Sequence, residues 1–343
     1  MPHFLTALIW LFAIFSLASG LAIQNDRRLS SGCGSTPSWS FNKEGHYTRS
    51  LNGRSYLVHI PASYNVNTSH PTVLSFHAFE EDPQNQELIS GFSAAGLEIN
   101  GTGIIAVYPE ALVGPGKGED GNIPQRAWQG APYSPKGVDD VTFTMDILQD
   151  LQENLCVDIS RIYASGKSNG GGFTNLLACN STSAAVFAAF APVSAALYSG
   201  TTPIDGCKPG RIIPIINFHG LSDDIIPFDG RSADVWTGDK RYALPNITEY
   251  REAWARRNAC NSSETGGDVV TIFSTITHPH KNTNLRVADC SPADIHSVMQ
   301  GFTVVGLGHS WPTTTGVDGG TTSFNATSAE IVPFFDQHWL EHV

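Results

Sequence analysis

Positive charge is scarce in this chain. Its 343 residues include 20 Lys and Arg against 32 Asp and Glu, a formal net charge of -12, and only 15% of residues are charged. No basic run is longer than the pairs Arg27-Arg28 and Arg256-Arg257. Binding to phosphate backbones or anionic lipid needs clustered basic side chains, so the charge balance disfavours nucleic acid and anionic membrane as partners.

Several sequence patterns are also missing. There is no Cys-x-x-Cys pair, no internal repeat and no Ser/Thr/Pro-rich linker between residues 33 and 343. His278 and His280 have no further ligand nearby, so we expect them at the surface and expect neither a metal nor a cofactor. With 41% hydrophobic residues the chain can bury a substantial core, and residues 33–343 are predicted to form a single catalytic domain.

The one long apolar run lies at the amino terminus. It extends from Phe4 to Ala18 and is followed by the small residues Ala18-Ser19-Gly20. This pattern predicts a signal peptide over residues 1–20, because the run is short for a bilayer span, which makes a membrane anchor the weaker alternative. Residues 21–32 are predicted to be a short propeptide or tail, in which Arg27-Arg28 is either a trimming site or part of a solvated segment.

Cysteine and asparagine usage agree with export. Six cysteines, an even number, favour three disulfides in a secreted chain: Cys33, Cys156, Cys179, Cys207, Cys260 and Cys290. Cys260 and Cys290 flank a polar insertion that they are expected to bridge, whereas the pairing of the other four stays open. Six Asn-x-Ser/Thr sequons are candidate glycosylation sites, not all of them necessarily used: Asn67, Asn100, Asn180, Asn246, Asn261 and Asn325.

Short β-rich runs alternate with helical stretches along the chain. Residues 47–60 alternate around the Asn52-Gly53 turn and predict a hairpin. Buried strands are predicted at 72–76, 104–108, 161–165, 187–193, 212–218 and 302–305, and helices at 141–155, 169–179, 247–258 and 328–341. This order predicts an α/β fold with a mostly parallel central sheet and helices on both faces.

Ser168 lies between the strand 161–165 and the helix 169–179, in the motif Gly166-Lys167-Ser168-Asn169-Gly170. Such a Gly-x-Ser-x-Gly pattern matches by chance in many chains, so its context decides. Here a strand, a sharp turn and a helix follow one another, which is the context that a nucleophile elbow requires. Ser168 is therefore the candidate nucleophile, and a plain serine in a glycine turn is the alternative.

A serine nucleophile needs a base and an orienting carboxylate, in the chain order Ser, acid, His. After the strand 212–218 comes His219-Gly220-Leu221-Ser222-Asp223-Asp224, and Asp223 is the candidate acid, with Asp224 as its rival. The strand 302–305 leads into Gly306-Leu307-Gly308-His309, and His309 is the candidate base. His219 is expected to hold the acid loop, because it precedes the acid in the chain.

Backbone amides must stabilise the oxyanion of the tetrahedral intermediate. The amide of Asn169 is one expected donor, and Ala78 or Phe79, on the loop after the strand 72–76, is the other. His77 is expected to shape this loop. The Gly- and Pro-rich segment 113–139 is too long for a plain connector, and its Trp128 and Tyr133, together with Phe79 and Trp311, are candidates for an aromatic acyl pocket or for core positions.

Three separated motifs carry a family resemblance: Ala164-Ser165-Gly166-Lys167-Ser168-Asn169-Gly170-Gly171-Gly172, His219 to Pro227, and Gly308-His309-Ser310-Trp311-Pro312. In this order they resemble secreted polyhydroxybutyrate-depolymerase-like serine esterases of the α/β-hydrolase fold, and among them the fungal feruloyl esterases of carbohydrate esterase family one. The segment Trp128 to Tyr133, followed by Gly137 to Val141, is similar to the feruloyl esterase branch. Ala78 stands where such proteins usually carry Gly.

The resemblance implies a secreted, monomeric enzyme whose Ser168, Asp223 and His309 hydrolyse hydroxycinnamoyl esters on plant cell-wall polysaccharide. An acetylxylan esterase or a polyhydroxyalkanoate depolymerase would use the same triad, because the triad does not encode the acyl group. A hydrolase-fold protein that binds without catalysis is the third alternative. It is disfavoured because all three triad members are present.

Overall fold

A computed structural model describes residues 28–114, 124–202, 206–235, 238–260, 262–265, 268–271, 273–277, 280–288 and 298–341. The predicted signal peptide over residues 1–20, and with it most of the segment 21–32, lies outside these residues. So do Asn261, His278 and Cys290. Within the described residues, no helix is long and apolar enough to cross a membrane.

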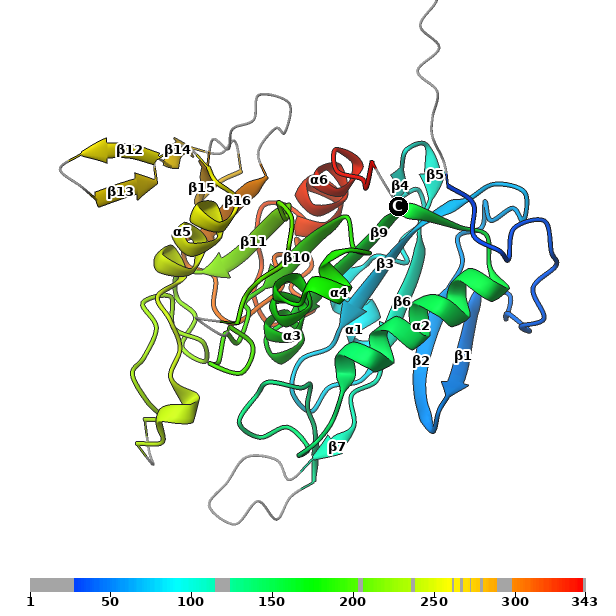
Figure 1. Ribbon diagram of the computed structural model, residues 1–343, viewed down its shortest axis with the longest axis horizontal. Coiled ribbons are helices and arrows are strands. Elements are labelled where there is room, and N and C mark those ends of the chain that lie inside the picture. Colours follow the sequence, from blue (N-terminus) through cyan, green and yellow to red (C-terminus); the bar gives the residue numbers. More distant parts are fainter. Residues whose placement is uncertain are drawn as a thin grey trace, which may run out of the picture.

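One ten-stranded sheet organises the molecule (Figure 1). In spatial order its strands are β1 (His46–Leu51), β2 (Arg54–His59), β6 (Ile105–Pro109), β3 (His70–Phe76), β9 (Val157–Lys167), β10 (Ala189–Val193), β11 (Ile215–Gly220), β16 (Met299–Val304), β15 (Thr283–Ala288) and β14 (Phe273–Thr277). The six strands from β6 to β16 are parallel, and antiparallel strands extend the sheet at both ends. The shorter pairs are β4 (Glu98–Ile99) with β5 (Thr102–Gly103), β7 (Val113–Gly114) with β8 (Gln125–Arg126), and β12 (Ser262–Thr265) with β13 (Asp268–Thr271).

The spatial order of the first eight large strands is that of an α/β-hydrolase. Numbered along the chain, they lie in the order 1-2-4-3-5-6-7-8, because β6 inserts between β2 and β3. The predicted fold class is therefore confirmed. The antiparallel pair β14 and β15, which lies beyond β16, was not predicted. The polar segment between helix α5 (Ile247–Arg257) and strand β16 forms this pair.

Helices cover both faces of the sheet. They are α1 (Pro83–Ser90), α2 (Asp140–Asn154), α3 (Asn169–Cys179), α4 (Ser181–Ala184), α5 (Ile247–Arg257) and α6 (Val332–Asp336), with a 3-10 turn at Lys240–Tyr242 and a π turn at Thr327–Ile331. Figure 1 shows α2 and α3 in front of the sheet. Their apolar side chains join one core cluster together with those of α5, and the side chains of α6 join the cluster on the opposite face.

Strand β6 shows why both faces are covered. Its residues Ile105 and Val107 belong to the cluster under α2 and α3, whereas Ala106 and Tyr108 belong to the cluster under α6. Successive side chains of a strand point to opposite faces, and here both sets are apolar. A strand of this kind is stable only inside a layered α/β core, which explains the continuous apolar runs in the sequence.

Two helix predictions differ from the structure. The helix expected over residues 328–341 ends at Asp336, because the chain turns back to the sheet: the amide of Leu340 donates to the carbonyl of Ser160 at 2.9 Å. Helix α1 was not predicted. Its signal was present in the sequence, since Asp82 caps it by accepting from the amide of Asn85 at 2.8 Å, and a proline follows at its first position.

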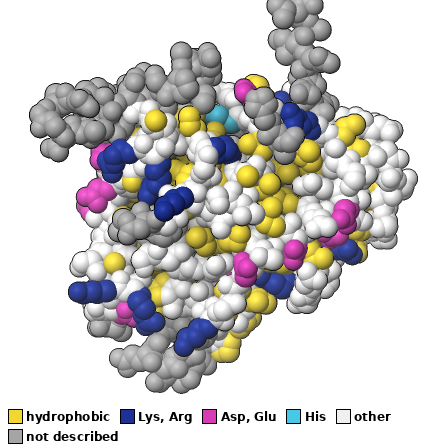
Figure 2. All heavy atoms as spheres, viewed as in Figure 1, with side chains coloured by type: hydrophobic (Ala, Val, Ile, Leu, Met, Phe, Trp, Pro, Cys, Tyr) yellow, Lys and Arg dark blue, Asp and Glu magenta, His cyan; other side chains and the backbone are white. Residues whose placement is uncertain are grey.

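Charged side chains do not form one block on the face seen in Figure 2. The Lys and Arg side chains lie at several separate places, with uncharged and apolar atoms between them. Two disulfides lie entirely within the described residues, Cys33–Cys156 and Cys179–Cys207, which settles the pairing that the sequence left open. Cys260 is also disulfide-bonded, and its expected partner lies outside the described residues.

Candidate active site

Ser168 sits on a strained turn between β9 and α3. Its backbone dihedrals are φ 53° and ψ -115°, a left-handed conformation that is unusual for any residue other than glycine. The turn is held by the amide of Ser168, which donates to the carbonyl of Val193 at the end of β10. Strain of this kind persists only where the surrounding structure enforces it, and it lifts the serine side chain off the path of the strand.

Two glycines make the close packing around this turn possible. A Cβ atom on Gly166 would lie 2.5 Å from the carbonyl oxygen of Gly170. A Cβ atom on Gly170 would lie 2.1 Å from the carbonyl oxygen of Phe76, at the end of β3. Because carbon and oxygen cannot approach so closely, both positions require glycine. The first turn of α3 is therefore pressed against the loop that follows β3.

His309 and Asp223 form a hydrogen-bonded pair at the same edge of the sheet. The Nδ1 atom of His309 lies 2.8 Å from Oδ2 of Asp223. A carboxylate has no proton to give, so Nδ1–H is the donor, and Nε2 is left as the acceptor that a general base needs. The other carboxylate oxygen, Oδ1, accepts from the amides of Ile225 and Ile226 at 3.1 and 2.8 Å. The side chain of Asp223 is fully buried, whereas Asp224 is exposed, so the structure brings Asp223 to the histidine and leaves its rival in solvent.

The carboxyl ends of parallel strands meet at one edge of a sheet, which is how residues far apart in the chain come together here. Ser168 follows β9, the loop with Asp223 follows β11, and the loop with His309 follows β16. Two loop contacts join these segments: the hydroxyl of Ser194, after β10, donates to the carbonyl of Ser310 at 3.4 Å, and Asp318 contacts both Lys167 and Trp311.

His219 holds the acid loop, as its position in the chain predicts. Its Nε2 atom lies 2.8 Å from the carbonyl oxygen of Ile226 and 3.5 Å from Oδ2 of Asp223. Burial lowers the pKa of His219 to about 4, so the ring is neutral at neutral pH and Nε2–H donates to the carbonyl. The ring therefore fixes the turn that follows β11 without adding a charge next to the acid.

His77 fixes the loop after β3 in a similar way. Its Nε2 atom accepts from the amide of Ala111 at 3.0 Å, so Nδ1 carries the proton and donates to the carbonyl of Ala78 at 2.7 Å. Burial lowers the pKa of His77 to about 4. The amide of Ala78 makes no hydrogen bond within the part of the chain that the structure describes, and it lies on the loop packed against the first turn of α3.

The two tryptophans proposed for an acyl pocket lie in the core instead. Trp128 is fully buried, stacks on Phe173 with ring centroids 5.2 Å apart, and donates from its indole to the carbonyl of His77 at 2.9 Å. Trp311 is also fully buried, and its indole donates to the hydroxyl of Thr327 at 3.1 Å. Packing on all sides leaves neither ring a face for substrate, so of the two alternatives, acyl pocket or core, the structure supports core positions for both tryptophans.

A cluster of aromatic rings next to the elbow contains two residues that sequence reasoning missed. Tyr133 packs against Phe79 with ring centroids 4.4 Å apart and against Tyr198 at 5.7 Å, and Tyr242 lies 5.9 Å from Tyr198. Ala196 belongs to the same cluster, and its amide donates to the carbonyl of Ser168 at 2.8 Å. Phe79 and Tyr242 are partly exposed. Neither Tyr198 nor Tyr242 lies in a recognisable motif.

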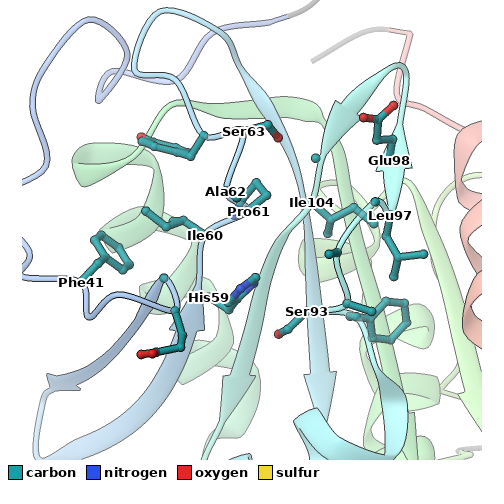
Figure 3. A pocket seen from close by; sticks show the side chains of 18 of the residues that line it. Phe41, His59, Ile60, Pro61, Ala62, Ser63, Ser93, Leu97, Glu98 and Ile104 are labelled. Atoms are coloured by element: carbon teal, nitrogen blue, oxygen red, sulfur yellow. The ribbon is translucent and has the colours of Figure 1, made fainter.

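A cavity of about 640 Å³ lies elsewhere in the molecule (Figure 3). Its lining includes Phe41, His59, Leu97 and Ile104. Ile104 precedes β6 and His59 ends β2, which runs antiparallel to β6, so the cavity lies at the amino edge of the parallel strands. Ser168 and His309 lie at the carboxyl edge. The cavity and these two residues therefore lie at opposite edges of the sheet.

The described residues contain no group of three His, Cys, Asp or Glu side chains that could hold a metal ion. His280 stacks on Phe324 and forms an ion pair with Glu330.

Among the sequons, the side-chain nitrogen of Asn100 is buried, which disfavours a glycan at that site. Asn180 and Asn246 cap helices, whereas Asn67 and Asn325 are exposed.

Strand order, the elbow at Ser168 and the His309–Asp223 pair together define a protein of the α/β-hydrolase fold with the layout of a serine hydrolase. No family model matches the chain. In sequence it is 30% identical over 207 residues to feruloyl esterase B of Piromyces equi, covering 60% of this chain and 36% of that protein. It is 28% identical over 262 residues to feruloyl esterase C of Emericella nidulans, covering 73% of this chain and 79% of that protein.

A bifunctional acetylxylan esterase/xylanase of Neocallimastix patriciarum is 27% identical over 171 residues, covering 50% of this chain and 22% of that protein. Among solved structures, the acetyl xylan esterase of Aspergillus awamori has a TM-score of 0.49 and 16% identity, covering 77% of this chain and 94% of that one. The chain is thus similar in sequence to two feruloyl esterases, although it spans only about a third of the length of the Piromyces equi protein.

Proposed function

We propose that this protein is a secreted serine esterase that cleaves hydroxycinnamoyl esters, such as feruloyl esters, from plant cell-wall polysaccharide. The observation that carries the proposal is the hydrogen bond of 2.8 Å between His309 and Asp223, at the sheet edge where Ser168 occupies a strained elbow. Its relatives named feruloyl esterases supply the substrate class. The disulfides support an oxidising compartment, where a secreted enzyme would fold.

The first half of the reaction forms an acyl-enzyme. Nε2 of His309 takes the proton of the Ser168 hydroxyl as its oxygen attacks the ester carbonyl, and Asp223 stabilises the imidazolium that results. The carbonyl oxygen becomes an oxyanion and is stabilised by the amides of Asn169 and of Ala78 or Phe79, the former at the amino terminus of α3. His309 then gives its proton to the sugar alkoxide, which leaves as an alcohol.

The second half releases the acid. His309 takes a proton from a water molecule, whose oxygen attacks the acyl carbonyl of the enzyme ester. The second tetrahedral intermediate collapses, the proton returns from His309 to the oxygen of Ser168, and the free carboxylic acid departs. No step requires a group other than these side chains, the backbone amides and water.

The aromatic cluster next to the elbow supports an aromatic acyl group. Tyr133, Tyr198 and the partly exposed rings of Phe79 and Tyr242 adjoin the backbone of Ser168 through Ala196. Tyr133 and Tyr198 are nearly as buried as Trp128, so only Phe79 and Tyr242 offer a ring face to substrate. A planar hydroxycinnamoyl group would pack edge-to-face on these two rings, with a gain of about 0.5–1.5 kcal/mol per ring pair beyond area burial. An acetyl group is too small to use this surface.

Acetyl esters on xylan are the second candidate substrate. The relationship to the bifunctional acetylxylan esterase/xylanase favours them, and the triad would act on an acetyl group by the same steps. A hydroxyalkanoate polyester is the third candidate, proposed from the sequence motifs.

A substrate panel tests these assignments. Purified protein is given methyl ferulate, acetylated xylan and hydroxybutyrate oligomers in parallel, and Ser168→Ala serves as the inactive control. We expect turnover of methyl ferulate, abolished in Ser168→Ala, and a lower kcat/KM for methyl ferulate in Tyr242→Ala with p-nitrophenyl acetate little affected. Turnover of acetylated xylan without any turnover of methyl ferulate would favour the second candidate and reject the first.

A further inference from the structure

Asp318 touches the chain neighbours of both the nucleophile and the base. One of its carboxylate oxygens lies 2.5 Å from Nζ of Lys167, and the other accepts from the amide of Trp311 at 2.6 Å. In addition, its carbonyl oxygen accepts from the hydroxyl of Ser310 at 2.7 Å. We propose that the Lys167–Asp318 ion pair is a positioning element that sets the placement of His309 relative to Ser168.

The residues that Asp318 contacts are close in sequence to Ser168 and His309. Lys167 is the last residue of β9 and is bonded directly to Ser168, and Ser310 follows His309 directly. Asp318 therefore joins the residue before the nucleophile to the two residues after the base. The pair Asp223–His309 orients the imidazole ring, whereas Asp318 fixes the backbone that carries this ring.

Asp318 itself is held in a loop that is closed by its own contacts. The amide of Thr322 donates to the carbonyl of Thr313, and the amide of Gly316 donates to the hydroxyl of Thr313 at 3.0 Å. At Gly320 a Cβ atom would lie 2.6 Å from a methyl group of Leu307, so the loop is packed tightly under the histidine loop. Because its loop holds the carboxylate of Asp318 in place, we expect this carboxylate to fix the positions of Lys167 and Trp311.

The energetics of buried ion pairs favour a positioning role for the Lys167–Asp318 pair over a role in stability. The side chains of Lys167 and Asp318 are only 9% and 12% exposed. Taking two charges out of water costs about as much as their attraction returns, so a buried pair adds little net stability, and its best-attested use is to select one geometry. Here the selected geometry is that of the two loops that carry the reacting groups.

Loss of the pair should therefore slow the chemical step and leave ester binding nearly unchanged. The rings proposed to contact the acyl group belong to other segments, on the loop after β3 and between β11 and α5. A displacement of about 1 Å between nucleophile and base costs on the order of 100-fold in rate. The expected signature is a lower kcat at an almost constant KM.

The buried ion pair between Arg161 and Asp158 provides a matched control. It lies near the start of the same strand β9, its atoms are 3.0 Å apart, and its side chains are 7% and 2% exposed. Asp158→Asn removes one charge from a pair of similar burial at the opposite end of the strand from Ser168. It should lower the melting temperature and leave kcat within twofold of the wild type.

The proposal rests on the triad of the proposed function, and the experiment separates the two. Lys167→Met, Lys167→Arg, Asp318→Asn, Asp158→Asn and Ser168→Ala are assayed with methyl ferulate or, if that is not turned over, with the ester that is. Labelling of Ser168 by a fluorophosphonate is followed in parallel. We expect kcat and the labelling rate to fall about 10- to 100-fold in Lys167→Met and Asp318→Asn, with KM within twofold, and to recover largely in Lys167→Arg.

Folded Lys167→Met and Asp318→Asn that keep kcat within twofold would overturn the proposal, provided that Ser168→Ala is inactive. Activity in Ser168→Ala would instead reject the triad itself. An equal loss of kcat in Asp158→Asn would show that any damage to β9 slows the reaction, which also contradicts a specific positioning role. Should Lys167→Met fail to fold, the nearly isosteric Asp318→Asn decides the question.

Discussion

Replacing Asp223 by asparagine is the sharpest test of the acid assignment, because the structure determines how the new amide must lie. Oδ1 of Asp223 accepts from the amides of Ile225 and Ile226. In Asp223→Asn the amide oxygen keeps this place, since the NH₂ group cannot accept a hydrogen bond. The NH₂ group then faces Nδ1 of His309 and donates to it.

The consequence is the wrong tautomer of His309. With Nδ1 as an acceptor, the proton moves to Nε2, and Nε2 can no longer take the proton of Ser168. Turning the amide over would restore the tautomer but break two hydrogen bonds to the backbone, at a cost of about 2–3 kcal/mol. Loss of the charge beside the imidazolium adds about 1.5–3 kcal/mol, the strength of a hydrogen bond to a charged group.

Together these two effects raise the barrier by about 3.5–6 kcal/mol, so kcat should fall roughly 400- to 25,000-fold. The assay is the steady-state rate with methyl ferulate or p-nitrophenyl ester at pH 7, alongside a thermal unfolding curve that confirms the fold. Asp224→Asn is the matched control: its side chain is exposed, and its kcat should equal that of the wild type. A folded Asp223→Asn that loses less than tenfold, or an Asp224→Asn that loses more, would refute the reasoning.

Three further predictions follow from burial and packing. Burial lowers the pKa of His219 and of His77 to about 4, so the unfolded chain binds an extra proton at each ring as the pH drops from about 6.5 to 4. Each ring lowers the free energy of unfolding by about 3 kcal/mol over that window, so the fall measured by urea titration should be about 3 kcal/mol smaller in His219→Gln than in the wild type. Removing the Cys33–Cys156 disulfide, with a sequence separation of 123, should cost about 4–5 kcal/mol in a denaturant titration, and a loss below 1 kcal/mol would contradict the loop-entropy argument. Gly170→Ala places a methyl carbon 2.1 Å from a carbonyl oxygen of β3, and it should cost about 3 kcal/mol or more in stability and abolish ester turnover; a stable, active variant would show that the two segments can separate.

Much of the fold was predictable because its signals are local. The hairpin around Asn52-Gly53 and the helix Asn169–Cys179 form where turn residues and apolar spacing predict them. The parallel strands β6 and β10 are short apolar runs, since both of their faces are buried. Strands β14 and β15 were not predictable from such runs, because they extend one end of the sheet and are composed largely of polar residues.

Within the site, the sequence could propose candidates but not choose among their neighbours. Asp223 and Asp224 are adjacent and chemically identical, and only the turn after β11 buries one and exposes the other. Trp128 lies in a long glycine-rich loop, a location typical of pocket residues, yet it packs between Phe76 and Phe173. Whether an aromatic ring faces a core or a ligand depends on segments distant in sequence.

The sequence by itself determined the strand-serine-helix elbow, the chain order of the proposed nucleophile, acid and base, and the alternation of strands and helices that makes the sheet parallel. These follow from local propensity and periodicity, which short segments carry on their own. Tertiary structure alone decided which carboxylate reaches His309, which rings gather beside Ser168, and that Asp318 contacts both the histidine loop and Lys167, which lies 151 residues earlier in the chain. Such contacts arise only when the sheet brings the ends of its parallel strands to one edge, because their geometry belongs to the packed chain and to no single segment of it.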